Sequence, residues 1–322
     1  MRTLGSTSFR LAGAGRALRL GVTVAIMLTG LVACSAGGGR QSGSSAAAAS
    51  GRPAVAGTPG THSPRAKAGA DWQHTLQVVA DLRAQPPNQP LVLMLGSSIV
   101  RESTVSDASW AAQVRQQGGP SVATYDAGSS NQTFAQDLKL VPYLPRVPAI
   151  VFIGVDVVRF VSPPSDPAVV LPAPKPVPPG YDPHRYSSAH ILPAAQKRSL
   201  VTAWMTNRFP IFSRNYSYNQ GQLEKLIKEC LARGVHPVLL DTPRNTAIIG
   251  RAFDKPVDRY RVTCLRLAAK YGIPFVDMVA SARFADTDFY DMWHAVQPGR
   301  AKWQLLLSDE TVKLLRRYGM GR

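Results

Sequence analysis

Apolar residues gather in five short runs along the body of the chain. Two of these runs, "LVLMLG" and "AIVFIGV", are apolar throughout, which is typical of strands buried on both faces of a parallel sheet. Three further segments, "SVATYDAG", "HPVLLDTP" and "IPFVDM", are more mixed but have the length of strands. The pattern therefore predicts strands at residues 91–96, 121–128, 149–155, 236–243 and 273–278.

Segments with helical spacing of apolar residues alternate with these runs. They cover residues 70–84, 106–119, 222–234, 257–272, 298–307 and 308–319. We expect Ser106 or Asp107 to cap the second of these helices and Ser308 to cap the last. Strands that alternate with helices predict an α/β fold, a three-layer sandwich with a five-stranded parallel sheet. In such sheets, reacting groups collect at the carboxyl ends of the strands.

One region, residues 160–219, interrupts this alternation. Its first part, "VSPPSDPAVVLPAPKPVPPGYDP", contains too much proline for a helix or a central strand. Its second part, "AAQKRSLVTAWMTNRFPIF", is typical of a short amphipathic helix with exposed aromatic residues. Insertions of this length are usually functional or disordered, so we expect a cap beside the active site, with a mobile surface loop as the alternative. Its aromatic residues either stack on a sugar or pack against the sheet; they are Tyr181, His184, Tyr186, Trp204 and Phe209.

The chain begins with a segment typical of export. Arginines precede an apolar stretch at residues 20–33 that is short for a membrane span. This stretch ends in "LVAC", which resembles a bacterial lipobox and would make Cys34 the lipidated first residue of the mature protein; an ordinary secretory signal with an incidental cysteine is the alternative. Residues 35–70 are rich in Gly, Ser, Ala and Pro, which is typical of a flexible linker.

These segments predict the organisation and location of the protein. Residues 1–34 form a lipoprotein signal peptide with its lipidated cysteine, residues 35–70 a tether, and residues 71–322 one α/β domain. Acyl chains on Cys34 would anchor this domain to the extracytoplasmic face of the bacterial cell membrane.

The composition supports a folded body with a positive charge. Apolar residues make up 45% of the chain and charged residues 18%, which argues against general disorder. The formal net charge is +17, of which eight positive charges lie before residue 70, where there are no acids, so about +9 belongs to the body. This excess is compatible with an anionic polymer or surface, and also with a basic proteome without a specific ligand. No basic stripe is interleaved with aromatic residues, so we do not expect a nucleic-acid partner.

The remaining cysteines, Cys230 and Cys264, lie in two helical segments that flank one predicted strand. An oxidising compartment permits a disulfide between them, and two small buried apolar side chains are the alternative. No Cys and His residues have the spacing of a zinc site, and we expect neither a metal nor a cofactor.

Two short motifs carry groups suited to acyl transfer. Gly96, Ser97 and Ser98 follow the first strand, so Ser98 is either a nucleophile or the polar end of a strand. Backbone amides after such a turn can receive an oxyanion. Near the C-terminus, Asp291 and His294 stand three residues apart in "DMWH". A nucleophilic serine needs a base, and the base needs a carboxylate to orient it.

The order of these blocks resembles the SGNH (GDSL-type) hydrolase superfamily, over residues 91–322. The family's Gly-Asp-Ser block corresponds to residues 96–98, and its Asp-x-x-His block to residues 291–294. The resemblance implies that Ser98 is the nucleophile, His294 the base and Asp291 the residue that orients it. It also implies a five-stranded parallel sheet between helices.

The blocks that would supply the oxyanion hole differ from the family pattern. Beside the Ser98 amide, the glycine of the second block is replaced by Asn131, whose backbone N–H can still donate; Gly128 is the alternative donor. In the third block, Gly-x-Asn reads Gly154-Val155-Asp156, and a carboxylate can donate only when it is protonated. The loss of one oxyanion donor typically lowers the rate about 10²–10³-fold.

These features predict a serine esterase or acyltransferase that acts on acyl esters of a cell-envelope polysaccharide or a related polymer. A non-catalytic binding or scaffold lipoprotein that keeps the fold is the alternative.

Overall fold

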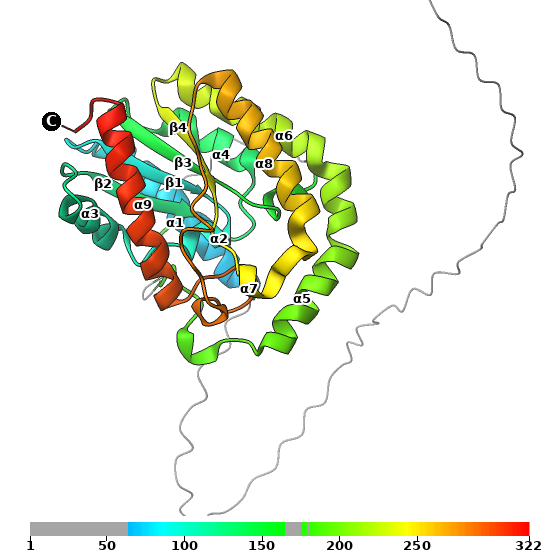
Figure 1. Ribbon diagram of the computed structural model, residues 1–322. Coiled ribbons are helices and arrows are strands. Elements are labelled where there is room, and N and C mark those ends of the chain that lie inside the picture. Colours follow the sequence, from blue (N-terminus) through cyan, green and yellow to red (C-terminus); the bar gives the residue numbers. More distant parts are fainter. Residues whose placement is uncertain (1–63, 165–174, 179–180, 322) are drawn as a thin grey trace, which may run out of the picture. The chain divides into compact units, whose positions relative to one another are not determined.

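The central feature of the fold is one parallel sheet with the strand order β2-β1-β3-β4-β5 (Figure 1). The computed structural model describes residues 64–164, 175–178 and 181–321. The strands are β1 (Leu91–Gly96), β2 (Ala123–Gly128), β3 (Ala149–Val155), β4 (His236–Asp241) and β5 (Phe275–Val276). All five predicted strands are confirmed. Strands β2, β4 and β5 are shorter than predicted, because residues at the ends of the predicted runs are not among the paired positions of the sheet.

The central strands β1 and β3 are buried along their whole length. In β1, Leu91, Leu93 and Leu95 face one hydrophobic core, whereas Val92 and Met94 face the other. Successive side chains of a strand point to opposite faces. Because both faces are covered, both sets must be apolar, and this explains the uninterrupted apolar runs in the sequence.

Helices cover both faces of the sheet and complete the predicted three-layer α/β sandwich (Figure 1). The first face carries α1 (Pro64–Ala84), α4 (Phe134–Leu140), α6 (Phe209–Ala232) and α8 (Asp254–Tyr271). The second face carries α3 (Asp107–Gln116) and α9 (Gln297–Arg317). The remaining helices are α2 (Ser98–Arg101), α5 (Ala194–Asn207) and α7 (Thr246–Ile249).

Two predicted helix caps have different outcomes. Ser106 caps α3, and its side chain accepts a hydrogen bond from the Ser109 amide at 3.1 Å. The predicted cap at Ser308 is wrong, because Ser308 lies buried in the middle of α9. The two predicted C-terminal helices are a single helix, since Leu307 and Val312 on either side of this point pack into the same core.

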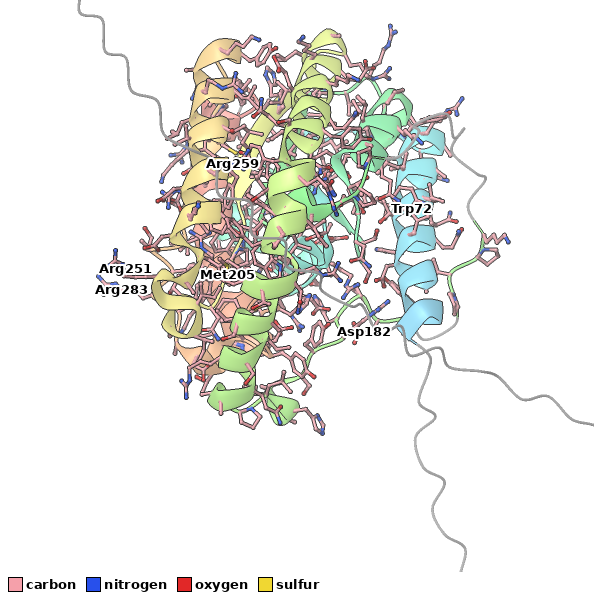
Figure 2. The ribbon with its side chains drawn as sticks, turned by 90° about the vertical axis from the view of Figure 1, so that its right-hand side faces the viewer. Trp72, Asp182, Met205, Arg251, Arg259 and Arg283 are labelled. Atoms are coloured by element: carbon pink, nitrogen blue, oxygen red, sulfur yellow. The ribbon has the colours of Figure 1, made fainter. Side chains whose placement is uncertain are left out.

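The second half of the predicted insertion is regular helix. Here α5 and α6 follow one another directly, and α6 begins at Phe209, well before the predicted start at residue 222. The expected exposure of the aromatic residues is wrong for Trp204 and Phe212, which are both buried. Trp204 packs edge-on against Phe253, with ring centroids 4.7 Å apart. Figure 2 shows α5 and α6 on the same side of the molecule as α1 and α8.

Cys230 and Cys264 are both buried and free. The two residues therefore do not form the disulfide considered above, and they pack as two small buried side chains, which was the alternative. Burial raises the pKa of Cys230 to about 12 and also raises that of Cys264, so both remain thiols.

The predicted signal peptide, Cys34 and most of the predicted linker lie outside the described residues. Within the described part of the chain, no helix is long and apolar enough to cross a membrane.

Candidate active site

Ser98 lies where the central strand β1 passes into the one-turn helix α2. Ser97 caps this helix, because its side-chain oxygen accepts a hydrogen bond from the Ile99 amide at 3.3 Å. The turn also needs a glycine at residue 96, since a Cβ there would come within 2.3 Å of a Val100 methyl group. These local constraints place Ser98 at the carboxyl end of the sheet.

The loop before α9 carries the other two predicted residues of the triad. His294 Nε2 lies 3.0 Å from Ser98 Oγ, and His294 Nδ1 lies 2.8 Å from Asp291 Oδ2. The tautomer with its hydrogen on Nδ1 satisfies both contacts, and it leaves Nε2 free to accept the serine proton. The structure therefore brings the three residues together in the hydrogen-bonded order that a nucleophile, its base and an orienting carboxylate require.

The carboxylate of Asp291 is held by its own loop. Its Oδ1 accepts hydrogen bonds from the backbone amides of Trp293 at 2.7 Å and His294 at 2.9 Å. Burial acts to raise the pKa of Asp291, but the neighbouring imidazole and these hydrogen bonds outweigh it and hold the pKa below its ordinary value. Asp291 is therefore ionised at neutral pH, where it stabilises positive charge on the imidazole.

A tyrosine from the insertion covers the imidazole. The Tyr186 ring stacks on the His294 ring, and their centroids are 4.4 Å apart. The ring of Tyr290 also packs against Tyr186, with a centroid distance of 4.5 Å. Burial raises the pKa of Tyr186 to about 12, so its phenol stays protonated. Two roles were expected for the aromatic residues of the insertion, sugar stacking and packing against the sheet. Tyr186 packs, but its partner is His294 and not the sheet.

Two backbone amides are available for an oxyanion. Asn131 adopts a left-handed conformation with φ 58°, and the hydrogen bond from the Gln132 amide to the Ser129 carbonyl at 3.2 Å closes its turn. Ser98 and Asn131 line the same cavity. Among the described residues, neither of their amides donates to a protein acceptor. Both can therefore donate to an oxygen bound beside Ser98 Oγ.

The other two predicted oxyanion residues lie elsewhere. The amide of Gly128 is already engaged, because it donates to Asp126 Oδ1 at 2.9 Å. Asp156 is buried and accepts two hydrogen bonds, from Ser97 Oγ at 3.0 Å and from the Arg159 amide at 2.9 Å. Neither Gly128 nor Asp156 lines the cavity. Asp156 thus supports the cap of α2 instead of facing an oxyanion.

Burial raises the pKa of Asp156, and the nearby Arg159 guanidinium opposes this shift. Arg159 itself forms a buried ion pair with Asp137. The region behind Ser98 is therefore a connected set of buried polar groups rather than an isolated carboxylate.

A cavity of about 970 Å³ opens beside Ser98 and His294. One wall is the segment at residues 158–164 that follows β3, and another comes from α5, α6 and the residue between them. The insertion therefore lines the cavity, as expected of a cap. Trp204, Ile211 and Trp293 give the walls an apolar character.

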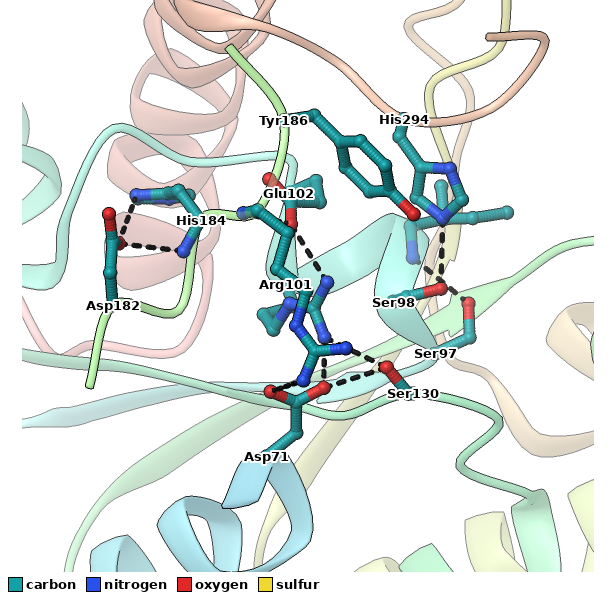
Figure 3. A network of polar contacts seen from close by, with 12 residues as sticks. Asp71, Ser97, Ser98, Arg101, Glu102, Ser130, Asp182, His184, Tyr186 and His294 are labelled. Carbon is teal, nitrogen blue, oxygen red and sulfur yellow. Dashed lines mark hydrogen bonds and ion pairs between the residues drawn. The ribbon is translucent and has the colours of Figure 1, made fainter. Parts of the chain in front are cut away.

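A network of buried charges lies beside α2 (Figure 3). Asp71 of α1 forms ion pairs with Arg101 and, at 2.6 Å, with Arg185 of the insertion. Glu102 pairs with Arg101 at 2.8 Å and also with Arg300 of α9. The network joins the insertion to α1, α2 and α9, and so to the turn that carries Ser98.

Sequence reasoning missed this network. Arg101 and Glu102 lie three and four residues after Ser98, and this pair of charges after an apolar strand was the available signal. Their partners could not be named, because Asp71 is 30 residues away from Arg101 and Arg300 is 198 residues away from Glu102. Within the described residues, no cluster of His, Cys, Asp and Glu could hold a metal ion.

Solved structures with a similar arrangement of elements include several esterases. A lipase/acylhydrolase from Enterococcus faecalis is 15% identical, with a TM-score of 0.40, over 73% of this chain and 97% of its own. An acetylxylan esterase from Geobacillus stearothermophilus is 15% identical, with a TM-score of 0.42 and the same coverage. A member of the lipolytic protein G-D-S-L family from Veillonella parvula is 12% identical, with a TM-score of 0.42, over 69% of this chain and 97% of its own.

Comparisons with protein-family models and with curated proteins found no match. At these levels of similarity, a function for this chain depends on the geometry of its own site.

Proposed function

We propose that this protein is an SGNH-type serine esterase or acyltransferase that acts on acyl esters of a cell-envelope polysaccharide or a related polymer. The observation that carries the proposal is the continuous hydrogen-bonded chain from Ser98 through His294 to Asp291 at the wall of a large cavity. Two free backbone amides beside the nucleophile complete the groups that acyl transfer requires.

In the first half of the reaction, Ser98 Oγ attacks the acyl carbonyl carbon and His294 Nε2 takes its proton. The carbonyl oxygen becomes an oxyanion, which the Ser98 and Asn131 amides receive. Asp291 stabilises the imidazolium that forms. When the tetrahedral intermediate collapses, the bond to the alcohol oxygen breaks and His294 returns the proton to the leaving alkoxide. The product is an acyl ester on Ser98.

In the second half, water or a sugar hydroxyl attacks the acyl-Ser98 ester. His294 takes the proton of this nucleophile and then gives it to Ser98 Oγ as the acyl group leaves. Attack by water makes the protein an esterase, and attack by a hydroxyl group of the polymer makes it an acyltransferase.

The envelope substrate follows from the expected location. A lipidated Cys34 and the tether at residues 35–70 would hold the domain on the extracytoplasmic face of the membrane, within reach of envelope polymers.

A binding or scaffold lipoprotein is the second candidate. It is favoured by Asp156, which stands where the resemblance implies an amide donor and instead accepts a hydrogen bond from Ser97. An oxyanion hole with one donor fewer lowers the rate of hydrolysis, and a binding module needs none.

Covalent labelling separates the two candidates. We expect a fluorophosphonate to label wild-type protein, and both Ser98→Ala and His294→Ala to abolish the labelling. Mass spectrometry of the labelled peptide would locate the adduct, and a panel of acetyl esters of neutral and acidic sugars would measure turnover. A wild-type protein that is neither labelled nor active on any member of the panel would support the binding module.

A further inference from the structure

The charged side chains that line the cavity beside Ser98 are all positive in the described part of the chain. Three arginines, Arg159, Arg208 and Arg214, line it, and its described lining contains no aspartate or glutamate. Such a distribution favours negative charge inside the cavity, particularly where apolar walls lower the local dielectric constant.

Arg159 is not available to a ligand as a free charge. It is buried, it forms an ion pair with Asp137, and its Nη1 donates to the Gly154 carbonyl at 2.6 Å. The Asp137 carboxylate and the Gly154 carbonyl compensate the positive charge of Arg159, so this side chain has a structural role.

Arg208 and Arg214 differ from Arg159 in both exposure and pairing. Both are exposed, and neither forms an ion pair with any residue in the described part of the chain. Most exposed arginines in the described part of the chain likewise form no ion pair, and Arg251, which pairs with Asp254 at 3.3 Å, is an exception. Arg208 and Arg214 are distinguished by their position at the cavity. The two cavity arginines are therefore positive charges that a ligand can reach.

Their spacing places them on one face of α6. Arg208 directly precedes this helix, and Ile211 and Arg214 follow at intervals of three residues, which is the spacing of neighbours on a helix surface. All three line the cavity. The face therefore presents an apolar residue between two guanidinium groups, beside the aromatic walls formed by Trp204 and Trp293.

We propose that Arg208 and Arg214 form an anion-binding subsite, so that the acyl ester taken by this site belongs to an acidic saccharide, with a carboxylate or a phosphate on the alcohol component. The inference rests on the proposed function, in which the polymer is that component. Guanidinium groups suit both anions, because their planar arrangement of donors matches carboxylate and phosphate oxygens.

Matched acetyl esters test the subsite. The probes are O-acetylated methyl glucoside, O-acetylated methyl glucuronoside and O-acetylated methyl glucoside 6-phosphate. We expect wild type to have a higher kcat/KM for one or both charged esters than for the neutral one. Arg208→Gln combined with Arg214→Gln should lower kcat/KM for the preferred charged ester about tenfold, mainly through KM, and change that for the neutral ester less than about twofold. The relative response of carboxylate and phosphate identifies the anion.

Ionic strength and a distant arginine provide the controls. Raising salt should weaken the wild-type preference for charged esters, because exposed charges are screened over about 8 Å at physiological ionic strength. The double variant should lose this salt dependence. Arg251→Gln removes the same charge from a side chain that is 97% exposed, is not among the residues that line the cavity and projects away from the body (Figure 2), and it should leave the preference unchanged. Thermal unfolding of each variant would check that the fold is intact.

The outcomes separate the inference from the proposed function. If wild type cleaves neutral and charged esters equally and the double variant behaves like wild type, the anion subsite is wrong and the esterase stands. If Ser98 is neither labelled nor acylated and no ester is cleaved, the proposed function fails. The inference then fails with it.

Discussion

At the scale of single residues, Asp156 is the side chain whose role differs most from the resemblance. The family pattern implies an amide donor at this position, facing the oxyanion. In this protein the carboxylate accepts the hydrogen of Ser97 Oγ, and the same oxygen of Ser97 accepts the Ile99 amide at the start of α2. Asp156 therefore acts on Ser98 indirectly, by fixing the turn that carries it.

This role predicts different effects for two substitutions of Asp156. Asp156→Ala should lower kcat about tenfold with little change in KM, because the cap of α2 loses its support while the substrate-binding walls remain. Asp156→Asn should keep kcat within about threefold of wild type. Its amide oxygen can still accept the Arg159 N–H, and its NH₂ can donate to Ser97 Oγ. Steady-state kinetics on an active acetyl ester would measure both. Equal activity of Asp156→Ala and wild type would remove Asp156 from any positioning role.

At the scale of elements, the site depends on how closely α2 lies against the ends of β1 and β3. A Cβ at Gly96 or at Gly154 would come within 2.3 Å of the same Val100 methyl group. The two glycines therefore let the helix that begins at Ser98 rest directly on the central strands. The close approach fixes Ser98 relative to the sheet, where the other elements of the site converge.

A second junction, between β2 and α3, contains two half-buried carboxyl groups, those of Asp107 and Asp126. Asp107 Oδ1 accepts a hydrogen bond from the Asp126 amide at 2.8 Å. Burial raises the pKa of Asp107 to about 6; burial and the neighbouring Asp107 raise that of Asp126 to about 7. Both groups titrate near pH 4 in an unfolded chain, so between about pH 4 and 7 the folded state binds more protons. The free energy of unfolding should therefore fall as pH rises through this range.

Asp126→Asn tests this effect. The asparagine oxygen can still accept the Gly128 amide, while the carboxylate charge is gone. We expect the free energy of unfolding at pH 8 to increase by about 1–3 kcal/mol and the pH dependence between 4 and 7 to become shallower. Urea denaturation at several pH values would measure this. Asp258→Asn, at an exposed position on α8, is the matched control and should change stability by less than about 0.5 kcal/mol. A less stable Asp126→Asn at pH 8 would contradict the expectation.

How far the sequence predicts these elements depends on whether a signal is local. The bounds of β1 and β3 match the prediction, because burial on both faces leaves a continuous apolar run between polar ends. The break at Ser308 was wrong, because a serine followed by acids is a local cap signal, whereas the packing of the whole α9 face decides the outcome. Tertiary burial outweighs a capping preference of about 1 kcal/mol.

The same distinction holds for the site. Ser98, Asp291 and His294 lie in short motifs that sequence reasoning can find. The stacking of Tyr186 on His294 and the arginines at the cavity depend on how a proline-rich insertion folds back, which no local pattern encodes. The role of Asp156 depends on Ser97, a partner 59 residues away.

At the scale of the whole molecule, the segment at residues 181–186 ties the insertion to α1, to the end of α2 and to α9. Tyr181 donates to Asp71 of α1 at 3.1 Å, and the Arg185 amide donates to Glu102 beside α2 at 2.9 Å. The Tyr186 carbonyl accepts from Arg300 of α9 at 2.9 Å. The last residue of this segment, Tyr186, is therefore held over the imidazole of His294 by contacts with elements distant in sequence.

The final prediction concerns the Arg185 side chain, which links this segment to Asp71 at 2.6 Å. In Arg185→Ala, Asp71 keeps its partner Arg101, so the domain should remain folded while the segment loosens. We expect amide hydrogen exchange at residues 181–190 to become at least about tenfold faster, and kcat to fall about tenfold, because the Tyr186 ring no longer holds His294 firmly. Tyr186→Ala should lower kcat to a similar extent, and Tyr186→Phe, which keeps the ring, should restore most of it. Arg115→Ala, at an exposed position on α3, should change neither quantity. Faster exchange in Arg185→Ala with an unchanged kcat would show that the segment covers the histidine without positioning it.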